Sequence, residues 1–562
     1  MSSTHRVFGL DELVRNIAHR ADATTQGSAS LLALACCCKS LEGPVMDVLW
    51  RRQTILPTIL ETLPADSWSV TNDVFVRKKL DFPPASWALP DFQSLSRNLS
   101  RDEWERFRRY TARVTALGVP KTYPWLVIPL YRFQPWISTE TIQIFWMESQ
   151  RGGLWPRVRS LECYIDWDIV PFISLFLTPT IADLCLSFPR NSNPLLQPAL
   201  SLLSHTCRQL QSLKVCVDTS GSPSGDEMGR LISASGNTLR SIDIQPSTPP
   251  ETFPAIFNLP LLRSLKLDDP RFPDLVPSEI LSPLEDVSLM RSHLPSLAQF
   301  LRRLSTKELA TVLISARETI QLHASLNSLT QAATTIKHLS IFPVTALDRS
   351  SITFLRTFAS LTSLTLGCVC GVPGGEGLAC SLQPTDQDLL DLGGALPRIH
   401  TLDLGLQCRK PCRATLKSLI GLSRICGSLE RLLIKVDFAS AVDGSGQQNH
   451  SNTSLGANNP RTQRGRSKLR VLSLGRSLLP DIPRCEWIVA LALFTIFPSI
   501  NSLTPSVTWE GVWSDILVCR RIFHAIEAEG KSLSTRPVVP MLMCLIQTRP
   551  QFYRPVRGSR LS

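Results

Sequence analysis

The chain repeats one short aliphatic pattern thirteen times between residues 158 and 505. In each repeat an aliphatic residue is followed three and five positions later by aliphatic residues or cysteine, except that the last repeat ends in proline. The spacing between starts, about 28 residues, is typical of leucine-rich repeats. The repeats start at Val158, Ile181, Leu210, Leu239, Leu262, Leu284, Leu309, Ile336, Leu361, Ile399, Leu429, Leu469 and Ile500. A possible earlier repeat contains Val114, Leu117 and Val119.

This spacing predicts one short β-strand per repeat. The residues at the fourth and sixth positions of the repeat are two apart, so on a strand their side chains point to the same face. Helix-compatible segments such as 195–207 and 385–396 lie between the predicted strands, and Thr385 and Asp386 are candidate caps for the second of them. A single repeat cannot bury its apolar face alone, so neighbouring repeats must stack. We therefore predict an α/β fold, a leucine-rich-repeat solenoid (horseshoe) with one strand and one helix per irregular repeat. A doubly wound sheet of unrelated elements would explain two or three repeats but not thirteen.

The same register separates core residues from surface residues. Leu265 and Leu267 are expected to be buried, whereas Lys266 between them should project outward. The outward-facing residues would line the concave side of the solenoid, where we expect a partner protein to bind. The candidate substrate-binding residues are Lys214, Ser241, Lys266, Ser288, Ser340, Thr365, Asp403 and Ser473.

The first 55 residues do not follow the repeat. Their apolar residues recur at helical spacing in three short segments, and Pro44 is expected to start the third helix. A domain of about 45 residues is marginal by itself, which makes a docking surface for another protein plausible.

The order VFGLDELVRNI, then LLALACCCKSLEGPVMDVLW, then irregular repeats resembles the F-box and F-box-like proteins with leucine-rich repeats, especially the large fungal, basidiomycete-type sets. This resemblance implies a three-helix box that docks on a Skp-type adaptor of a cullin-RING ubiquitin ligase, with the repeats capturing a substrate protein. The opening Leu-Pro that is usual in the family is Val7-Phe8 here. The positions that would face the adaptor are Val7, Phe8, Leu10, Leu13, Ile17, Leu31, Leu34, Ala35, Cys38, Leu41, Pro44, Leu49 and Trp50.

These patterns divide the chain into four expected parts. Residues 1–55 would form the F-box-like helical domain, 56–150 a helical linker and N-terminal cap, 151–530 the solenoid, and 531–562 a basic tail. Residues 440–467 are nearly free of large apolar side chains and should form a mobile loop between two repeats.

Enzymatic function is not indicated by any motif. The nine histidines are scattered, and the segment ending Gly530-Lys531-Ser532 lacks the first glycine of a phosphate loop. The cysteines between 368 and 412 match zinc spacing only loosely. We expect a non-catalytic protein without a cofactor or bound metal.

Two other functions stay open at this stage. A formal charge of +12 permits nucleic-acid binding, but the basic clusters lie in separate segments with no recognition module, which makes nucleic acid an unlikely partner. The chain could also be a protein-binding scaffold whose N-terminal helices contact no adaptor. Adjacent Cys36, Cys37 and Cys38 indicate reduced thiols, and no signal peptide or membrane span is visible, so we expect a cytoplasmic or nuclear protein.

Overall fold

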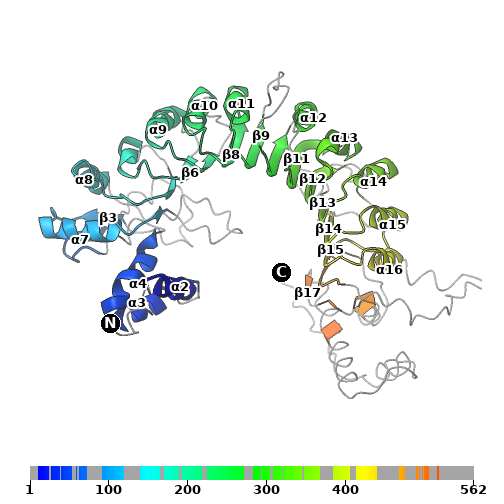
Figure 1. Cartoon of the computed structure of the whole chain (residues 1–562), viewed down its shortest axis with the longest axis horizontal. Helices are drawn as coiled ribbons and strands as arrows, with labels where there is room; N and C mark the ends of the chain where they lie inside the picture. Colours follow the sequence, from blue (N-terminus) through cyan, green and yellow to red (C-terminus); the bar gives the residue numbers. More distant parts are fainter. Residues whose placement is uncertain are drawn as a thin grey trace, which may run out of the picture. The chain divides into compact units, whose positions relative to one another are not determined.

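The computed structural model divides the chain into two bodies, Met1–Leu382 and Gln383–Ser562, which we describe separately (Figure 1). The structure describes residues 11–23, 27–37, 39–53, 59, 62–71, 92–118, 139–164, 170–188, 193–217, 225–270, 272, 283–292, 294–303, 308–320, 322–344, 347–367, 382, 384–405, 413–438, 468–474, 477 and parts of 489–517.

Three helices open the N-terminal body: α2 (Asp11–Asp22), α3 (Gly27–Cys37) and α4 (Lys39–Arg51). They match the three predicted apolar segments. The predicted start of the third helix was wrong, because α4 begins at Lys39 and contains Pro44 in its interior. Val45 and Val48 on this helix are buried in a shared core, and this packing outweighs the local preference of proline for a helix start.

A parallel sheet follows these helices in the N-terminal body, and its strands lie side by side in sequence order. Two short strands, β2 (Trp68–Thr71) and β3 (Phe92–Leu95), form a separate antiparallel pair. The strands of the parallel sheet are β1 (Arg52–Gln53), β4 (Ala116–Leu117), β5 (Ser160–Tyr164), β6 (Asp183–Phe188), β7 (Ser212–Val217), β8 (Ser241–Thr248), β9 (Ser264–Pro270), β10 (Asp286–Ser292), β11 (Thr311–Ile320), β12 (His338–Val344) and β13 (Ser363–Leu366).

Helices cover one face of this sheet in the N-terminal body (Figure 1). The predicted helix at 195–207 is α9 (Asn193–Thr206), and the connection from β5 to β6 contains a 3-10 helix, η2 (Val170–Leu175), rather than an α-helix. The other helices and turns are α7 (Arg101–Thr111), α8 (Thr139–Ser149), α10 (Gly225–Ala234), η3 (Pro250–Thr252), α11 (Phe253–Phe257), α12 (Leu294–Arg303), α13 (Leu322–Ser328), η4 (Thr330–Ala332) and α14 (Arg349–Leu355).

The C-terminal body continues the same pattern of parallel strands and helices. Its elements are α15 (Asp386–Ala395), β14 (Thr401–Leu404), α16 (Leu416–Ile425), β15 (Arg431–Leu433), β16 (Val471–Ser473) and β17 (Ser502–Thr504). The predicted cap of α15 is confirmed: the hydroxyl of Thr385 accepts a hydrogen bond from the backbone N–H of Asp388. Helices α15 and α16 pack closely. A Cβ atom added to Gly421 on α16 would lie 2.0 Å from Cδ2 of Leu390 on α15.

All thirteen predicted repeats form strands, from β5 to β17, and each strand begins two residues after the start of its repeat. The first aliphatic residue of every repeat is at most 2% exposed. This is the pattern of a leucine-rich-repeat solenoid, and the predicted fold class is confirmed. The possible earlier repeat forms β4, and one further strand, β1, precedes it. The sheet therefore starts well before residue 151.

Several predicted segments lie outside the described residues. These are the loop at 440–467, the tail at 531–562 and the cysteines at positions 368, 370, 380, 408 and 412.

Candidate functional site

The three N-terminal helices, which we call the box, share one apolar core. Val14 and Ala18 of α2, Leu31 of α3, and Val45 and Val48 of α4 are at most 6% exposed. Leu34, Ala35, Leu41 and Leu49 are partly buried against this core. The core residues of α2 recur four positions apart, so a single face of that helix points inward.

Three large apolar side chains of the box remain exposed to solvent. Leu13 is 51%, Ile17 49% and Leu32 50% exposed, and we call these three the box stripe. Leu13 and Ile17 lie one turn apart on α2, so they share a face. In the described part of the chain, seven large apolar side chains are strongly exposed, and three of the seven lie on the adjacent short helices α2 and α3. Such concentration is typical of an interaction surface.

The structure separates the predicted adaptor-facing positions into groups. Leu13 and Ile17 are exposed, as that role requires, whereas Leu31 is fully buried and is therefore part of the core. Pro44 and Trp50 are half-buried. Val7, Phe8, Leu10 and the side chain of Cys38 lie outside the described residues. The sequence reasoning missed Leu32, because successive leucines on α3 point in different directions and the sequence did not indicate which one faces inward.

Trp50 connects the box to the first repeats. Its ring lies 4.9 Å from that of Tyr110 on α7, measured between centroids, at an interplanar angle of 50°. Close by, Arg113 forms an ion pair with Asp47 at 3.2 Å and donates a hydrogen bond to the carbonyl oxygen of Gly43 at 3.1 Å. Strand β1 also continues from α4 into the parallel sheet. The box is therefore fixed to the N-terminal end of the repeats.

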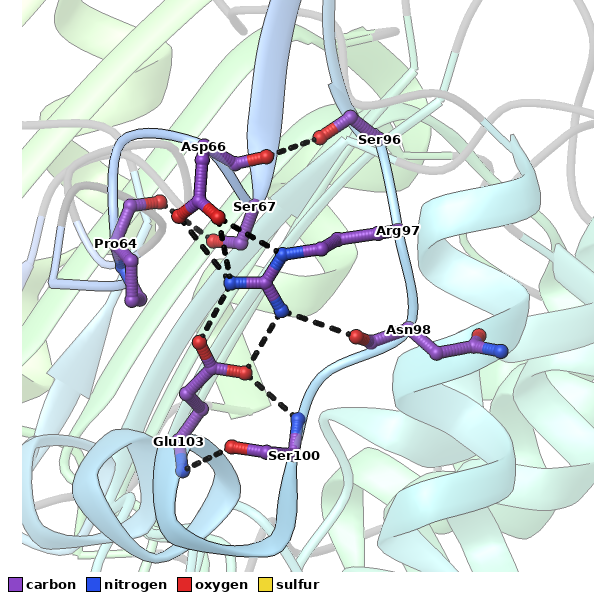
Figure 2. Close-up of polar contacts among 8 residues, drawn as sticks. All are labelled: Pro64, Asp66, Ser67, Ser96, Arg97, Asn98, Ser100 and Glu103. Atoms are coloured by element: carbon purple, nitrogen blue, oxygen red, sulfur yellow. Dashed lines mark hydrogen bonds and ion pairs between the residues drawn. The ribbon is translucent and has the colours of Figure 1, made fainter.

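A polar cluster orders the start of α7 (Figure 2). The guanidinium of Arg97 donates to Asp66 at 3.1 and 3.2 Å and to Glu103 at 3.0 and 2.7 Å. Glu103 also accepts a hydrogen bond from the backbone N–H of Ser100 at 2.7 Å, and the hydroxyl of Ser100 accepts one from the backbone N–H of Glu103, which completes a capping box. Arg97, followed by Ser100, lowers the pKa of Glu103 to about 2.

The sheet of the N-terminal body offers a second candidate surface. Alternate strand residues point away from the buried layer of leucines, and we call this the open face. Its central row, joined by the strand register, consists of Glu162, Cys185, Lys214, Asp243, Lys266, Ser288, Leu313, Ser340 and Thr365.

Charges alternate in sign along part of this row. Lys214 lies 3.7 Å from Asp243 of the next strand, and Lys266 follows Asp243 in register. Burial lowers the pKa of Lys214, but the neighbouring Cys216, Asp243, Cys185 and Glu162 together raise it by more, so the pKa lies above its usual value and the ammonium is held charged. The row from Ser288 to Thr365 is uncharged. The open face therefore presents a charged part and a neutral part.

Most of the predicted substrate-binding residues lie at strand positions that are not buried. Lys266 is exposed, and Lys214, Ser288, Ser340, Thr365 and Asp403 are half-buried. Ser241 does not belong to the central row. The residue of β8 in that row is Asp243, which lies two residues after Ser241. The sequence reasoning missed Asp243, although it stands four residues after Leu239 as Lys266 does after Leu262. Asp403 and Ser473 belong to the C-terminal body.

Ser473 does not project outward as predicted. It is 3% exposed, and the preceding Leu472 is fully buried, so both faces of β16 are covered at this point. The alternation that exposes Lys266 fails where a strand is covered on both sides.

Within the described helices, none is long and apolar enough to cross a membrane. No protein-family model matches the chain, and no curated protein matches it. Among solved structures, an internalin, InlF of Listeria monocytogenes, is 13% identical with a TM-score of 0.32, over 66% of this chain and 94% of that one. A complex of Rad7 and Elc1 from yeast gives 14% identity and a TM-score of 0.33, over 61% of this chain and 84% of that one. These scores are low, and the repeat fold rests on the strand order described above.

Proposed function

We propose that this chain is the substrate-recognition subunit of a Skp-cullin-F-box ubiquitin ligase. In this role the box binds a Skp-type adaptor, which links it to a cullin scaffold, and the open face binds the substrate protein. The chain would carry no catalytic residues and would act in the cytoplasm or nucleus. The order of motifs in residues 5–52 resembles the family, and the exposed box stripe carries the proposal.

The box stripe supports docking for an energetic reason. Three half-exposed large apolar side chains leave apolar area in water, and burying such area stabilises an interface by roughly 25 cal/mol per Å². Interfaces concentrate their binding energy in a few central side chains of this size. The box is also fixed to the repeats through Trp50 and Arg113, so an adaptor bound there would hold the open face in place.

The test is a binding measurement with a purified Skp-type adaptor and the full-length chain. The double variant Leu13→Asp/Ile17→Asp should lower the affinity at least about a hundredfold, because two charges would be placed in an apolar interface. Leu261→Asp is a matched control, since Leu261 is 42% exposed but lies on a repeat. Circular dichroism establishes that each variant is folded. Absence of binding by the wild type would refute the proposal.

A second function, that of a protein-binding scaffold without a ubiquitin-ligase role, is favoured by one specific observation. Leu31 and Trp50, two of the predicted adaptor-facing residues, make contacts inside the chain: Leu31 in the box core and Trp50 against Tyr110. A box that only caps the end of the repeats would use both residues in this way. A folded wild-type chain that does not bind the adaptor would favour this function.

A further inference from the structure

Three large apolar side chains lie on the open face, on three neighbouring strands. They are Met290 of β10, Leu313 of β11 and Phe342 of β12, and we call them the face patch. Met290 is 40% exposed, and the other two are half-buried. The strand residues next to them are buried in the core, namely Leu289, Val312, Ile314 and Ile341. The face patch therefore points to the open side of the sheet.

The strand register places Leu313 at the centre of the face patch. Leu313 stands opposite Ser288 of β10 and Ser340 of β12. Met290 and Phe342 each follow one of these serines by two residues, so they are the diagonal neighbours of Leu313 on the same face. The face patch is thus one continuous feature of three strands rather than three scattered side chains.

Small uncharged residues surround the face patch. Ser288, Ser340 and Thr365 belong to the central row beside it, and Ser315 is in register with Phe342. Their hydroxyls can both donate and accept hydrogen bonds, as the backbone of a bound segment requires. An apolar area with such a border suits a large apolar side chain of a partner, because interfaces concentrate their binding energy in central contacts of this kind.

Two ion pairs neutralise most of the charge beside the face patch. Lys214 lies 3.7 Å from Asp243, and Arg291 donates to the two carboxylate oxygens of Asp268 at 2.6 and 2.5 Å. Lys266, by contrast, is exposed and makes no ion pair within the described residues. Its ammonium group therefore remains available to an acidic group of a partner.

Lys266 is the charged residue of the central row nearest to the face patch. It is in register with Ser288, which in turn is in register with Leu313. Neighbouring strands lie about 4.8 Å apart, so Lys266 and Leu313 are separated by about 10 Å along the row, which an extended chain covers in about three residues. Asp286 of β10 is half-buried and precedes the central row by two residues, on the side away from Met290.

We propose that the face patch and Lys266 bind an extended segment of the substrate protein that carries a large apolar side chain and, about three residues away, an aspartate or glutamate. This inference rests on the proposed role of the open face as the substrate-binding surface. The apolar side chain packs on Leu313 between Met290 and Phe342, and the carboxylate pairs with Lys266. The apolar contact supplies most of the affinity, and the ion pair determines which segments fit.

The test uses a phage-displayed library of random dodecapeptides, selected on the immobilised full-length chain. Labelled synthetic copies of the enriched peptides are then titrated with the chain, and binding is followed by fluorescence polarisation. We expect enrichment of sequences that combine leucine, phenylalanine or tryptophan with an acidic residue about three positions away.

The double variant Met290→Ser/Leu313→Ser removes most of the face patch. Serine already occupies the positions on both sides of Leu313 in the central row, so it fits these strands. The affinity for the enriched peptides should fall about tenfold or more, because the central apolar contact is lost. Leu261→Ser is the matched control and should leave the affinity unchanged, since Leu261 is 42% exposed but precedes β9.

Lys266→Gln tests the charge separately. The affinity should fall about threefold to tenfold at low salt, and high salt should remove this difference because it screens an exposed ion pair. Lys337→Gln is the control, because Lys337 is an exposed lysine that precedes β12 and lies outside the central row. If the double variant at the face patch fails to fold by circular dichroism, this pair of variants and the composition of the enriched peptides still decide the proposal.

Three results would overturn the proposal: no enriched peptide, equal affinity of the enriched peptides for the wild type and the folded Met290→Ser/Leu313→Ser variant, or basic residues in place of the acidic one. Binding of a Skp-type adaptor is measured on the same proteins and should be unchanged, because the box is intact in every variant. Peptide binding without adaptor binding would refute only the ligase role. Adaptor binding without peptide binding at the face patch would refute only this inference.

Discussion

The ring of Phe342 lies directly over Gly367, which follows the neighbouring strand of the sheet. A Cβ atom on residue 367 would stand 1.8 Å from Cδ1 of that ring, far inside van der Waals contact. The backbone N–H of Gly367 also donates to the carbonyl oxygen of Ile341 at 2.9 Å, so the two strands cannot separate without losing this hydrogen bond. Glycine is required here by the closeness of a side chain rather than by an unusual backbone angle.

This relationship predicts that Gly367→Ala destabilises the N-terminal body by roughly 1 to 3 kcal/mol, as overpacking does. The double variant Gly367→Ala/Phe342→Ala should recover most of that loss relative to Phe342→Ala alone, because the ring that causes the clash is gone. Chemical denaturation of the wild type, both single variants and the double variant measures the coupling. Additive effects would show that the ring does not cover Gly367.

Leu265 and Lys266 test the register of the strands. Leu265 is fully buried and Lys266 is exposed. Leu265→Ala should destabilise the fold by about 2 to 5 kcal/mol, whereas Lys266→Ala should change stability by no more than about 0.5 kcal/mol. Thermal unfolding of the two variants checks this difference, and equal effects would contradict the alternation.

Glu103 gives a prediction for pH dependence. Its pKa is lowered from 4.5 to about 2, so the folded state favours the ionised carboxylate. The stabilising effect is therefore fully present above pH 4.5 and is lost as the pH falls from 4.5 toward 2. NMR titration of the Glu103 carboxyl group should show a midpoint near 2 that moves toward 4.5 in Arg97→Gln. A normal midpoint in the wild type would contradict the cluster in Figure 2.

Thr415 connects two successive repeats in the C-terminal body. Its hydroxyl donates to Asp386 at 2.6 Å and accepts from the backbone N–H of Lys417 at 3.2 Å, which caps α16. Thr415→Ala should lower the stability of this body by about 1 kcal/mol, and Thr415→Ser should retain most of it because the hydroxyl is kept. Thermal denaturation compares the two variants, and an equal loss in both would show that the hydroxyl contributes little.

The repeats could be predicted from the sequence because their signal is local and redundant. Alternation every two residues identifies a strand, and thirteen copies of the same pattern determine both the fold class and which residues are buried. The prediction failed where a strand is covered on both faces. Ser473 has the spacing of an outward residue, yet β16 is covered on both faces.

The candidate sites depended more strongly on tertiary structure. The sequence indicated apolar helices in residues 5–52, but only the packing of α2, α3 and α4 decided that Leu31 is buried and Leu32 exposed. The contact of Trp50 with Tyr110 joins residues from separate segments, and no local pattern indicates it.

The sequence by itself thus determined the solenoid, the order of its strands and the buried leucines, because stacking is the way in which such repeats bury their apolar faces. Tertiary structure alone decided which side chains of the box remain in solvent and which groups gather on the open face. The physical reason is that burial and side-chain contact depend on how neighbouring elements pack, whereas strand alternation depends only on the chain itself.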